Sequence, residues 1–198
     1  MFTKKVIYRL KLRTLEKFLE RRGLPPLGNR YAILAYGSNA CPQQLLNKNP
    51  TDVPGLYGRL TGAGAVYAGK KTERGYVPAT LARKKGSRAS WVTLLTRDQL
   101  QAMDASEGRQ HNTYVLAELS KVRFSVGRSR FIPLYTYVRI RGGVMTRNGK
   151  SVGLRSTSQK RAKQLLPTES GEDAARWLDY QLIPHPNPPA NFSQILLQ

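Results

Sequence analysis

Residues 31–39 read YAILAYGSN, and this stretch decides the fold of the main domain. Its first six residues are apolar or aromatic, which predicts a buried strand. The polar turn Gly37-Ser38-Asn39 follows, and Pro42 then opens the segment PQQLL, which predicts a helix because proline is favoured in a first helical turn. The local order is therefore strand, polar turn and helix.

Outward from this unit, the pattern predicts several more strands separated by loops, and two helices. The expected strands are Gly55–Ala68, Tyr76–Ala82, Ala89–Leu95, Val115–Leu119 and Ile132–Ile140. The expected helices are an amphipathic one over Arg9–Arg22 and one over Arg97–Ser106, with Thr96 as its N-cap. Strands scattered among helices without regular alternation predict an α+β fold, with a small mixed or barrel-like sheet flanked by helices.

Three regions are expected along the chain. Residues 1–30 form a basic amphipathic N-terminal extension, residues 31–140 the core, and residues 141–198 a basic and Pro-rich C-terminal extension. Within the last region we expect a loop over Thr146–Ser158 and a helix over Gly171–Ile183, which Glu172 and Asp173 would favour at its N-terminus. Phe192–Leu197 is expected either to dock on the body or to bind a partner.

The charge is far from balanced. Lys and Arg number 33 against 12 Asp and Glu in 198 residues, a net charge of +21. Residues 121–163 carry many of these cations and no acid, and residues 1–30 are also strongly basic. We expect a polyanionic partner, RNA or DNA, bound through these two regions. Composition leaves an anionic membrane surface and a merely solubilising charge as alternatives.

Composition also argues against a membrane helix, a secretory signal and a metal site. No apolar stretch is long enough for a membrane helix, and the first residues lack the apolar segment of a secretory signal, so we expect an intracellular, cytoplasmic protein. Cys41 is the single cysteine, and His111 and His185 are the two histidines. We therefore expect no structural or catalytic metal.

The turn after the first strand suits anion binding. Successive backbone N–H groups at Gly37, Ser38 and Asn39 offer a cradle for a carboxylate or a developing oxyanion. By itself such a turn is more typical of a simple helix cap. Later segments change this interpretation: an inner strand at Ala79-Thr80-Leu81, the run MDASEG at residues 103–108, and Tyr114.

In this order, the segments resemble the gamma-glutamylcyclotransferase-like superfamily over about residues 31–140. The family opens with a strand that ends in a Tyr-Gly-Ser-Asn turn and carries an acidic residue in a later Glu-Gly segment. The resemblance implies that Glu107 is the catalytic general base and acid. It also implies that the substrate is bound by Tyr36, Gly37, Ser38, Asn39 and Tyr114; Tyr135, in an alternating strand, is a further candidate for the pocket.

The implied reaction is intramolecular and needs neither metal nor cofactor. The α-amino group of a small-molecule γ-glutamyl amine or amide attacks its own γ-carbonyl, closing 5-oxoproline and expelling an amine. We expect enclosure by Tyr36 or Tyr114 to tune Glu107 for this proton transfer.

A rival hypothesis from the same sequence is a protein without turnover. In it, the cyclotransferase fold serves as a structural subunit of a nucleic-acid-containing assembly, a ribonucleoprotein or a virion. The charge favours this second hypothesis. Glu107 together with the intact loop favours an enzyme, and we rank the enzyme first.

Overall fold

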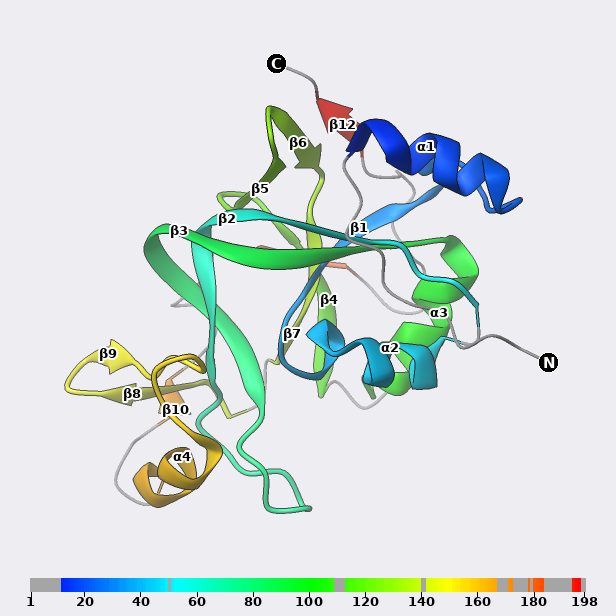
Figure 1. Ribbon diagram of the computed structural model, residues 1–198. Coiled ribbons are helices and arrows are strands. Elements are labelled where there is room, and N and C mark those ends of the chain that lie inside the picture. The colour runs from blue at the N-terminus through cyan, green and yellow to red at the C-terminus, as the bar shows by residue number, and fades with distance from the viewer. Residues whose placement is uncertain are drawn as a thin grey trace.

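A computed structural model describes residues 12–49, 51–108, 113–139, 142–166, 171–172, 178, 180–183 and 194–196. Its main element is a curled nine-stranded sheet with the order β11-β4-β7-β1-β3-β2-β5-β6-β12 (Figure 1). The sheet is mixed, because β1 pairs parallel to β7 while the other neighbours pair antiparallel. Four α-helices accompany it in the described residues. The expected α+β class with a mixed, barrel-like sheet is thus confirmed.

The bounds of the sheet strands are β1 Tyr31–Ala35, β2 Gly55–Tyr67, β3 Ala79–Leu95, β4 Tyr114–Leu119, β5 Arg123–Val126, β6 Ser129–Ile132, β7 Tyr135–Arg139, β11 Tyr180–Leu182 and β12 Gln194–Leu196. The helices are α1 Leu12–Arg21, α2 Pro42–Lys48, α3 Arg97–Ser106 and α4 Gln159–Leu165, with short 3-10 turns η1 at Leu27–Asn29 and η2 at Gly37–Ala40.

β1 lies at the centre of the sheet and is buried on both faces. Because side chains alternate along a strand, Ala32 and Leu34 enter one core cluster while Tyr31 and Ile33 enter a second one. The first cluster also holds Leu15 and Leu19 of α1 and Leu56, Leu60, Val92, Phe124 and Phe131 of the sheet. The second holds Leu45 of α2 and Leu100 and Met103 of α3, so these two helices cover the other face of β1 (Figure 1).

β2 and β3 form one long ribbon that bends across the molecule (Figure 1). The sequence predicted two strands, Tyr76–Ala82 and Ala89–Leu95, separated by a loop, and this was wrong. β3 runs unbroken over Ala79–Leu95 because nearly its whole length pairs with β2, with a register shift between Thr61 and Gly62. The shift leaves Lys85 and Gly86 without a partner in β2, and pairing on both sides of it carries the polar residues 83–88 as a strand despite their low β propensity.

The C-terminal region holds a second, three-stranded sheet in the order β10-β8-β9. Its strands are β8 Val144–Arg147, β9 Lys150–Ser151 and β10 Gly171–Glu172. The loop expected over Thr146–Ser158 was therefore wrong in part, because Asn148-Gly149 is the two-residue turn of a β8–β9 hairpin. Helix α4 packs against this sheet through Ala162 and Leu165.

The helix expected over Gly171–Ile183 is also contradicted. Among the described residues of that range, β10 pairs with β8, and β11 pairs antiparallel with β4 at the edge of the large sheet. Pairing with an open strand edge overrides the local preference of this segment. β12 pairs with β6, so the described part of Phe192–Leu197 docks on the body, as one of the two expectations stated.

No helix in the described residues is long and apolar enough to cross a membrane. The described part of the N-terminal extension begins at α1, which confirms the amphipathic helix there. The division into the regions 1–30, 31–140 and 141–198 stays a prediction.

Candidate functional site

Glu107 is held at the C-terminal end of α3. The helix starts with a capping box in which Thr96 accepts from the Gln99 N–H and the Gln99 side chain accepts from the Thr96 N–H. It ends where the Glu107 N–H donates to the Met103 carbonyl, 3.0 Å away. The side chain of Glu107 is only 8% exposed. A surface carboxylate, the commoner fate of a Glu before Gly, is therefore excluded.

Lys48 joins Glu107 to the loop after β1. It is the last residue of α2, and its Nζ forms an ion pair with Glu107 Oε1. The same Nζ donates to Asn39 Oδ1 at 2.7 Å. One ammonium group therefore ties together the two segments that the sequence resemblance had paired. Sequence reasoning missed Lys48, since a lysine in the last turn of a helix is common for electrostatic reasons alone.

The loop after β1 is the 3-10 turn η2, and its first residue, Gly37, has a backbone conformation that favours glycine. Gly37 has φ +56°, and a Cβ there would lie 3.1 Å from the Cβ of Ala79 on the inner strand. The Asn39 N–H donates to the Tyr36 carbonyl at 3.1 Å, so Asn39 offers the site its side chain instead of its backbone. The N–H groups of Gly37 and Ser38 have no hydrogen bond to any described residue. These two donors can receive an anion.

Two phenols lie next to Glu107. The Tyr36 hydroxyl donates to the Tyr137 carbonyl, and the Tyr114 hydroxyl donates to the Ala79 carbonyl at 2.8 Å. Burial raises the pKa of Tyr36 well above its usual range, with the neighbouring Tyr114 and Glu107 adding to the shift. Burial likewise raises the pKa of Tyr114 to about 12, against the opposing effect of Arg139. Both phenols are therefore neutral hydrogen-bond donors at neutral pH.

Arg139 is a second residue that sequence reasoning missed. It is buried at the end of β7, opposite Tyr114 of β4 in the antiparallel register. Its guanidinium carbon lies 5.6 Å from the centroid of the Tyr114 ring. The available signal was an arginine at the inward position of the alternating run Tyr135–Arg139, where an apolar residue is expected.

Tyr135 is placed elsewhere. It is buried in the second core cluster and packs edge-on against Tyr31, with ring centroids 6.0 Å apart. The neighbouring Tyr137 is the one that connects to the site: its carbonyl accepts from Tyr36, and its hydroxyl donates to the buried Asp104.

The other reactive residues lie apart from this constellation or outside the described residues. Cys41 is exposed at the N-cap of α2. His111 and His185 lie outside the described residues. No group of three side chains that could hold a metal ion occurs in the part of the chain that the structure describes.

A cavity of about 380 Å³ opens on the loop at Tyr36 and Gly37. It extends along the β2–β3 ribbon, where its lining includes Trp91 and two basic residues of β3, Lys84 and Arg88. The segment after β9 closes it with Arg155. Tyr36 therefore belongs both to this cavity and to the cluster around Glu107.

Comparison with known proteins gives structural neighbours only. No family model and no curated protein matches the chain. A solved gamma-glutamyl cyclotransferase aligns at 17% identity and TM-score 0.47, over 73% of this chain and 90% of that one. An uncharacterized protein from Homo sapiens aligns at 19% identity and TM-score 0.47 with the same coverage. YkqA from Bacillus subtilis aligns at 14% identity and TM-score 0.45, over 79% of this chain and 60% of that one.

The neighbours thus include a protein of the family that the sequence resembles. At these identities and TM-scores the likeness does not extend to activity.

Proposed function

We propose that this protein is an enzyme of the gamma-glutamylcyclotransferase type that releases 5-oxoproline from a γ-glutamyl amine or amide. The observation that carries the proposal is the ammonium group of Lys48, which contacts both Asn39 of the loop and Glu107. A nearly buried carboxylate beside a turn with two unused N–H donors provides a base and an anion cradle within one site.

The loop would position the γ-glutamyl unit. The N–H groups of Gly37 and Ser38 receive either the α-carboxylate of the substrate or the oxyanion that forms at its γ-carbonyl. A γ-glutamyl chain held in a bent conformation brings its α-nitrogen close to its γ-carbon. This proximity supplies much of the rate increase in an intramolecular reaction.

Glu107 would carry the proton. As a carboxylate it takes a proton from the α-ammonium group, and the freed amine attacks the γ-carbonyl carbon to form a tetrahedral intermediate. When the intermediate collapses, the bond to the leaving nitrogen breaks and Glu107 returns its proton to that nitrogen. The ring nitrogen then gives its second proton to Glu107, which passes it to the amine, so that 5-oxoproline keeps one N–H and the amine leaves as an ammonium ion. The ion pair with Lys48 holds this carboxylate beside the loop that would bind the substrate.

The aromatic residues would shape the site. Tyr36 and Tyr114 are already anchored to backbone carbonyls, so their rings are fixed before substrate binds. Arg139 adds a buried positive charge next to Tyr114. A preorganised site of this kind needs little rearrangement during the reaction.

The test is 5-oxoproline release from a panel of γ-glutamyl amino acids and amines, by wild type and by Glu107→Gln. The near-isosteric variant keeps the shape of the side chain and removes the base, so we expect a loss of activity of about 10²–10⁴-fold. Glu73→Gln, an exposed carboxylate on the surface, is the matched control and should retain activity. Full activity in Glu107→Gln would refute the proposed role.

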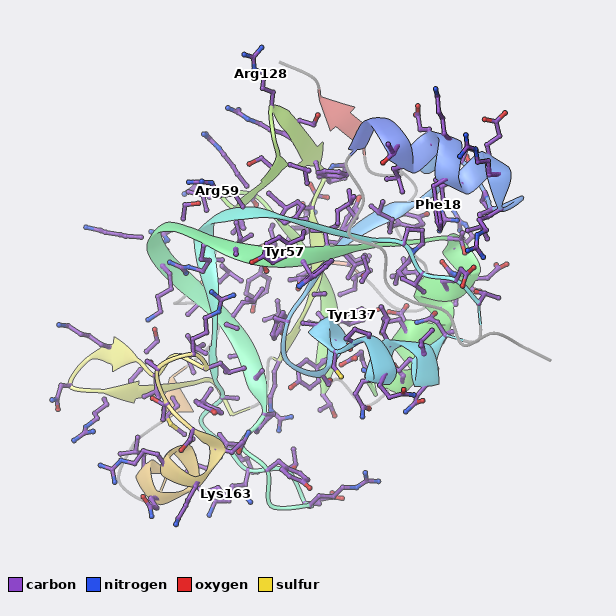
Figure 2. All side chains as sticks on the ribbon, viewed as in Figure 1. Phe18, Tyr57, Arg59, Arg128, Tyr137 and Lys163 are labelled. Atoms are coloured by element: carbon purple, nitrogen blue, oxygen red, sulfur yellow. The ribbon has the colours of Figure 1, made fainter. Side chains whose placement is uncertain are left out.

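A second candidate function has an observation of its own in its favour. The net charge is +21, and exposed cations lie on projecting elements: Arg128 at the tip of the β5–β6 hairpin (Figure 2), Arg147 and Lys150 on the β8–β9 hairpin, and Lys160 and Arg161 on α4. We propose as the alternative a structural subunit of a nucleic-acid-containing assembly, which binds RNA or DNA through residues 1–30 and 121–163.

A further inference from the structure

The cavity beside the loop holds three cations that the proposed proton transfer does not use. Lys84 and Arg88 come from β3, and Arg155 comes from the segment after β9. They converge from two separate parts of the chain on a space of about 380 Å³. The volume suits a small molecule and is too large to be a packing defect.

Backbone carbonyls hold all three cations in place. Lys84 Nζ donates to the Ser151 carbonyl at 3.1 Å, and Arg155 Nη2 donates to the Ala89 carbonyl at 2.8 Å. Arg88 is the most firmly seated, with bonds of 2.7 Å to the Ala63 carbonyl and 2.8 Å to that of Lys85. These contacts with the chain itself position the cations, which lowers the entropic cost of binding a ligand.

The chain makes room for Arg88 in particular. A Cβ on Gly64 of β2 would lie 2.2 Å from Arg88 Nη1, so any larger residue at position 64 would displace the guanidinium. The guanidinium thus lies directly against the backbone of the opposite strand. Arg88 is therefore fixed by contacts with the backbone, whereas a solvated surface arginine is free to change its conformation.

No counter-charge accompanies these cations in the described part of the chain. No ion pair there involves Lys84, Arg88 or Arg155, and no Asp or Glu lines the cavity. Burial lowers the pKa of Lys84 and Arg88, and repulsion from Arg88 and Arg155, respectively, lowers them further. Like charges held together at partly buried positions repel one another, and a bound anion would relieve that repulsion.

The cavity also reaches the binding loop after β1. Its lining includes Tyr36 and Gly37, and the hydroxyl of Tyr36 lies with Glu107 and Tyr114. A ligand whose acidic end meets the three cations would therefore have its other end against the loop that we propose to bind the γ-glutamyl unit.

We infer that this cavity is the subsite for the leaving amine, and that the substrates are γ-glutamyl compounds whose amine part carries a phosphate or an additional carboxylate. This inference rests on the proposed function. Lys84, Arg88 and Arg155 are then specificity-determining residues, which bind the acidic part of the substrate and take no part in proton transfer.

Anion binding can be measured without turnover. We would titrate inorganic pyrophosphate into the wild type, Lys84→Gln, Arg155→Gln and the double variant, and follow the heat of binding. Each lost cation should weaken binding about tenfold, since each substitution removes a hydrogen bond to a charged group. Arg74→Gln removes the same charge at an exposed position between β2 and β3, outside the cavity, and should bind as the wild type does.

The second arm measures the substrate class. Release of 5-oxoproline is compared for γ-glutamyl-aspartate, γ-glutamyl-O-phosphoethanolamine and γ-glutamyl ethylamide, whose amine parts carry two carboxylates, a phosphate and no charge. In the double variant we expect KM for the acidic substrates to rise about 100-fold with kcat little changed, and the kinetics for the ethylamide to stay the same. The more strongly affected acidic substrate identifies the group that the cavity takes.

The outcomes separate the two proposals. Equal loss for acidic and neutral substrates, or no loss for either, would overturn the inference and leave the proposed function standing. Absence of 5-oxoproline from all three substrates in the wild type would overturn the proposed function and the assignment of the ligand with it. Pyrophosphate binding that is equal in all five proteins would show that the cavity is not an anion site. Because Arg155 is exposed, we expect Arg155→Gln to fold, and it tests the inference even if Lys84→Gln unfolds.

Discussion

Single residues decide whether the loop and the carboxylate form one site. Lys48 contacts both Asn39 and Glu107, which are contributed by segments on either side of the long β2–β3 ribbon in sequence. The loop keeps its shape because Gly37 adopts a left-handed conformation against Ala79. The Lys48 contacts and the Gly37 conformation each depend on one residue, so both can be tested by point substitutions.

Gly37→Ala should damage the site directly. The new Cβ would meet the Cβ of Ala79 at 3.1 Å, and alanine disfavours the φ of +56°. We expect a loss of about 1–2 kcal/mol in the free energy of urea unfolding and a raised KM for γ-glutamyl substrates. Gly28→Ala is the matched control, since no atom lies within 4 Å of its added Cβ. An unchanged KM in Gly37→Ala would contradict the binding role of the loop.

The buried phenol of Tyr114 should make the free energy of unfolding fall as the pH rises above about 10. An unfolded chain loses the phenol proton near pH 10, whereas the folded protein keeps it until about pH 12. Between these values the unfolded state binds fewer protons, so the free energy of unfolding falls as pH rises. We expect the wild type to lose about 2 kcal/mol more than Tyr114→Phe between pH 9.5 and pH 12.

Urea unfolding at several pH values in that window measures the effect. Tyr76→Phe, which alters an exposed tyrosine, serves as the control and should follow the wild type. Parallel pH curves for the wild type and Tyr114→Phe would show that the buried phenol makes no such contribution.

The sequence predicted part of the site and missed part of it, for a physical reason. Glu107, Tyr36 and Tyr114 belong to motifs that are visible in the order of residues, and the structure brings them together. Lys48 and Arg139 carry no motif, and only the packing of α2 and the register of β7 bring them to the site.

Among whole elements, α3 was predicted to the residue because its signals are local. Thr96 caps it, the periodic residues Leu100 and Met103 bury one face, and Glu107 and Gly108 end it. The long strand β3 and the short strand β5 both pair with β2, and β6 pairs with β12; local propensity does not reveal such distant partners. The β8–β9 hairpin was predictable, since Asn-Gly is a strong turn signal.

The cap of α3 offers a test at this scale. Thr96→Ala removes the oxygen that accepts from the Gln99 N–H, and we expect the free energy of unfolding to fall by about 1 kcal/mol. Thr96→Ser keeps the hydroxyl and should stay within a few tenths of a kcal/mol of the wild type. Urea denaturation of the three proteins measures both values, and equal losses in the two variants would mean that the hydroxyl is not what caps the helix.

For the molecule as a whole, the net charge of +21 has two candidate roles: to keep the protein soluble, or to bind a polyanionic partner. If nucleic acid is bound, log affinity for duplex DNA should fall linearly with log salt concentration, with a slope of about −0.9 per phosphate contacted. Fluorescence anisotropy with labelled RNA and DNA between 50 and 200 mM salt, about a fourfold range, would measure the slope.

The triple variant Arg128→Gln, Arg147→Gln and Lys150→Gln removes exposed charges from two hairpins and should give a shallower slope. Absence of salt-sensitive binding to either nucleic acid would leave the charge with a solubilising role and remove the support for the structural-subunit alternative.

The central position of β1 also has a consequence for how the chain is made. Its parallel partner is β7, and the Thr136 hydroxyl donates to the Leu34 carbonyl across 102 positions of sequence. At about 5–20 residues per second, a ribosome needs roughly 5–20 s to synthesise that interval. Both edges of the strand that leads into the binding loop are open until β3 is made, and one edge stays open until β7 is made. An open edge of this kind can bind chaperones or pair with another chain. The earliest strand of the core is thus among the last to be completed.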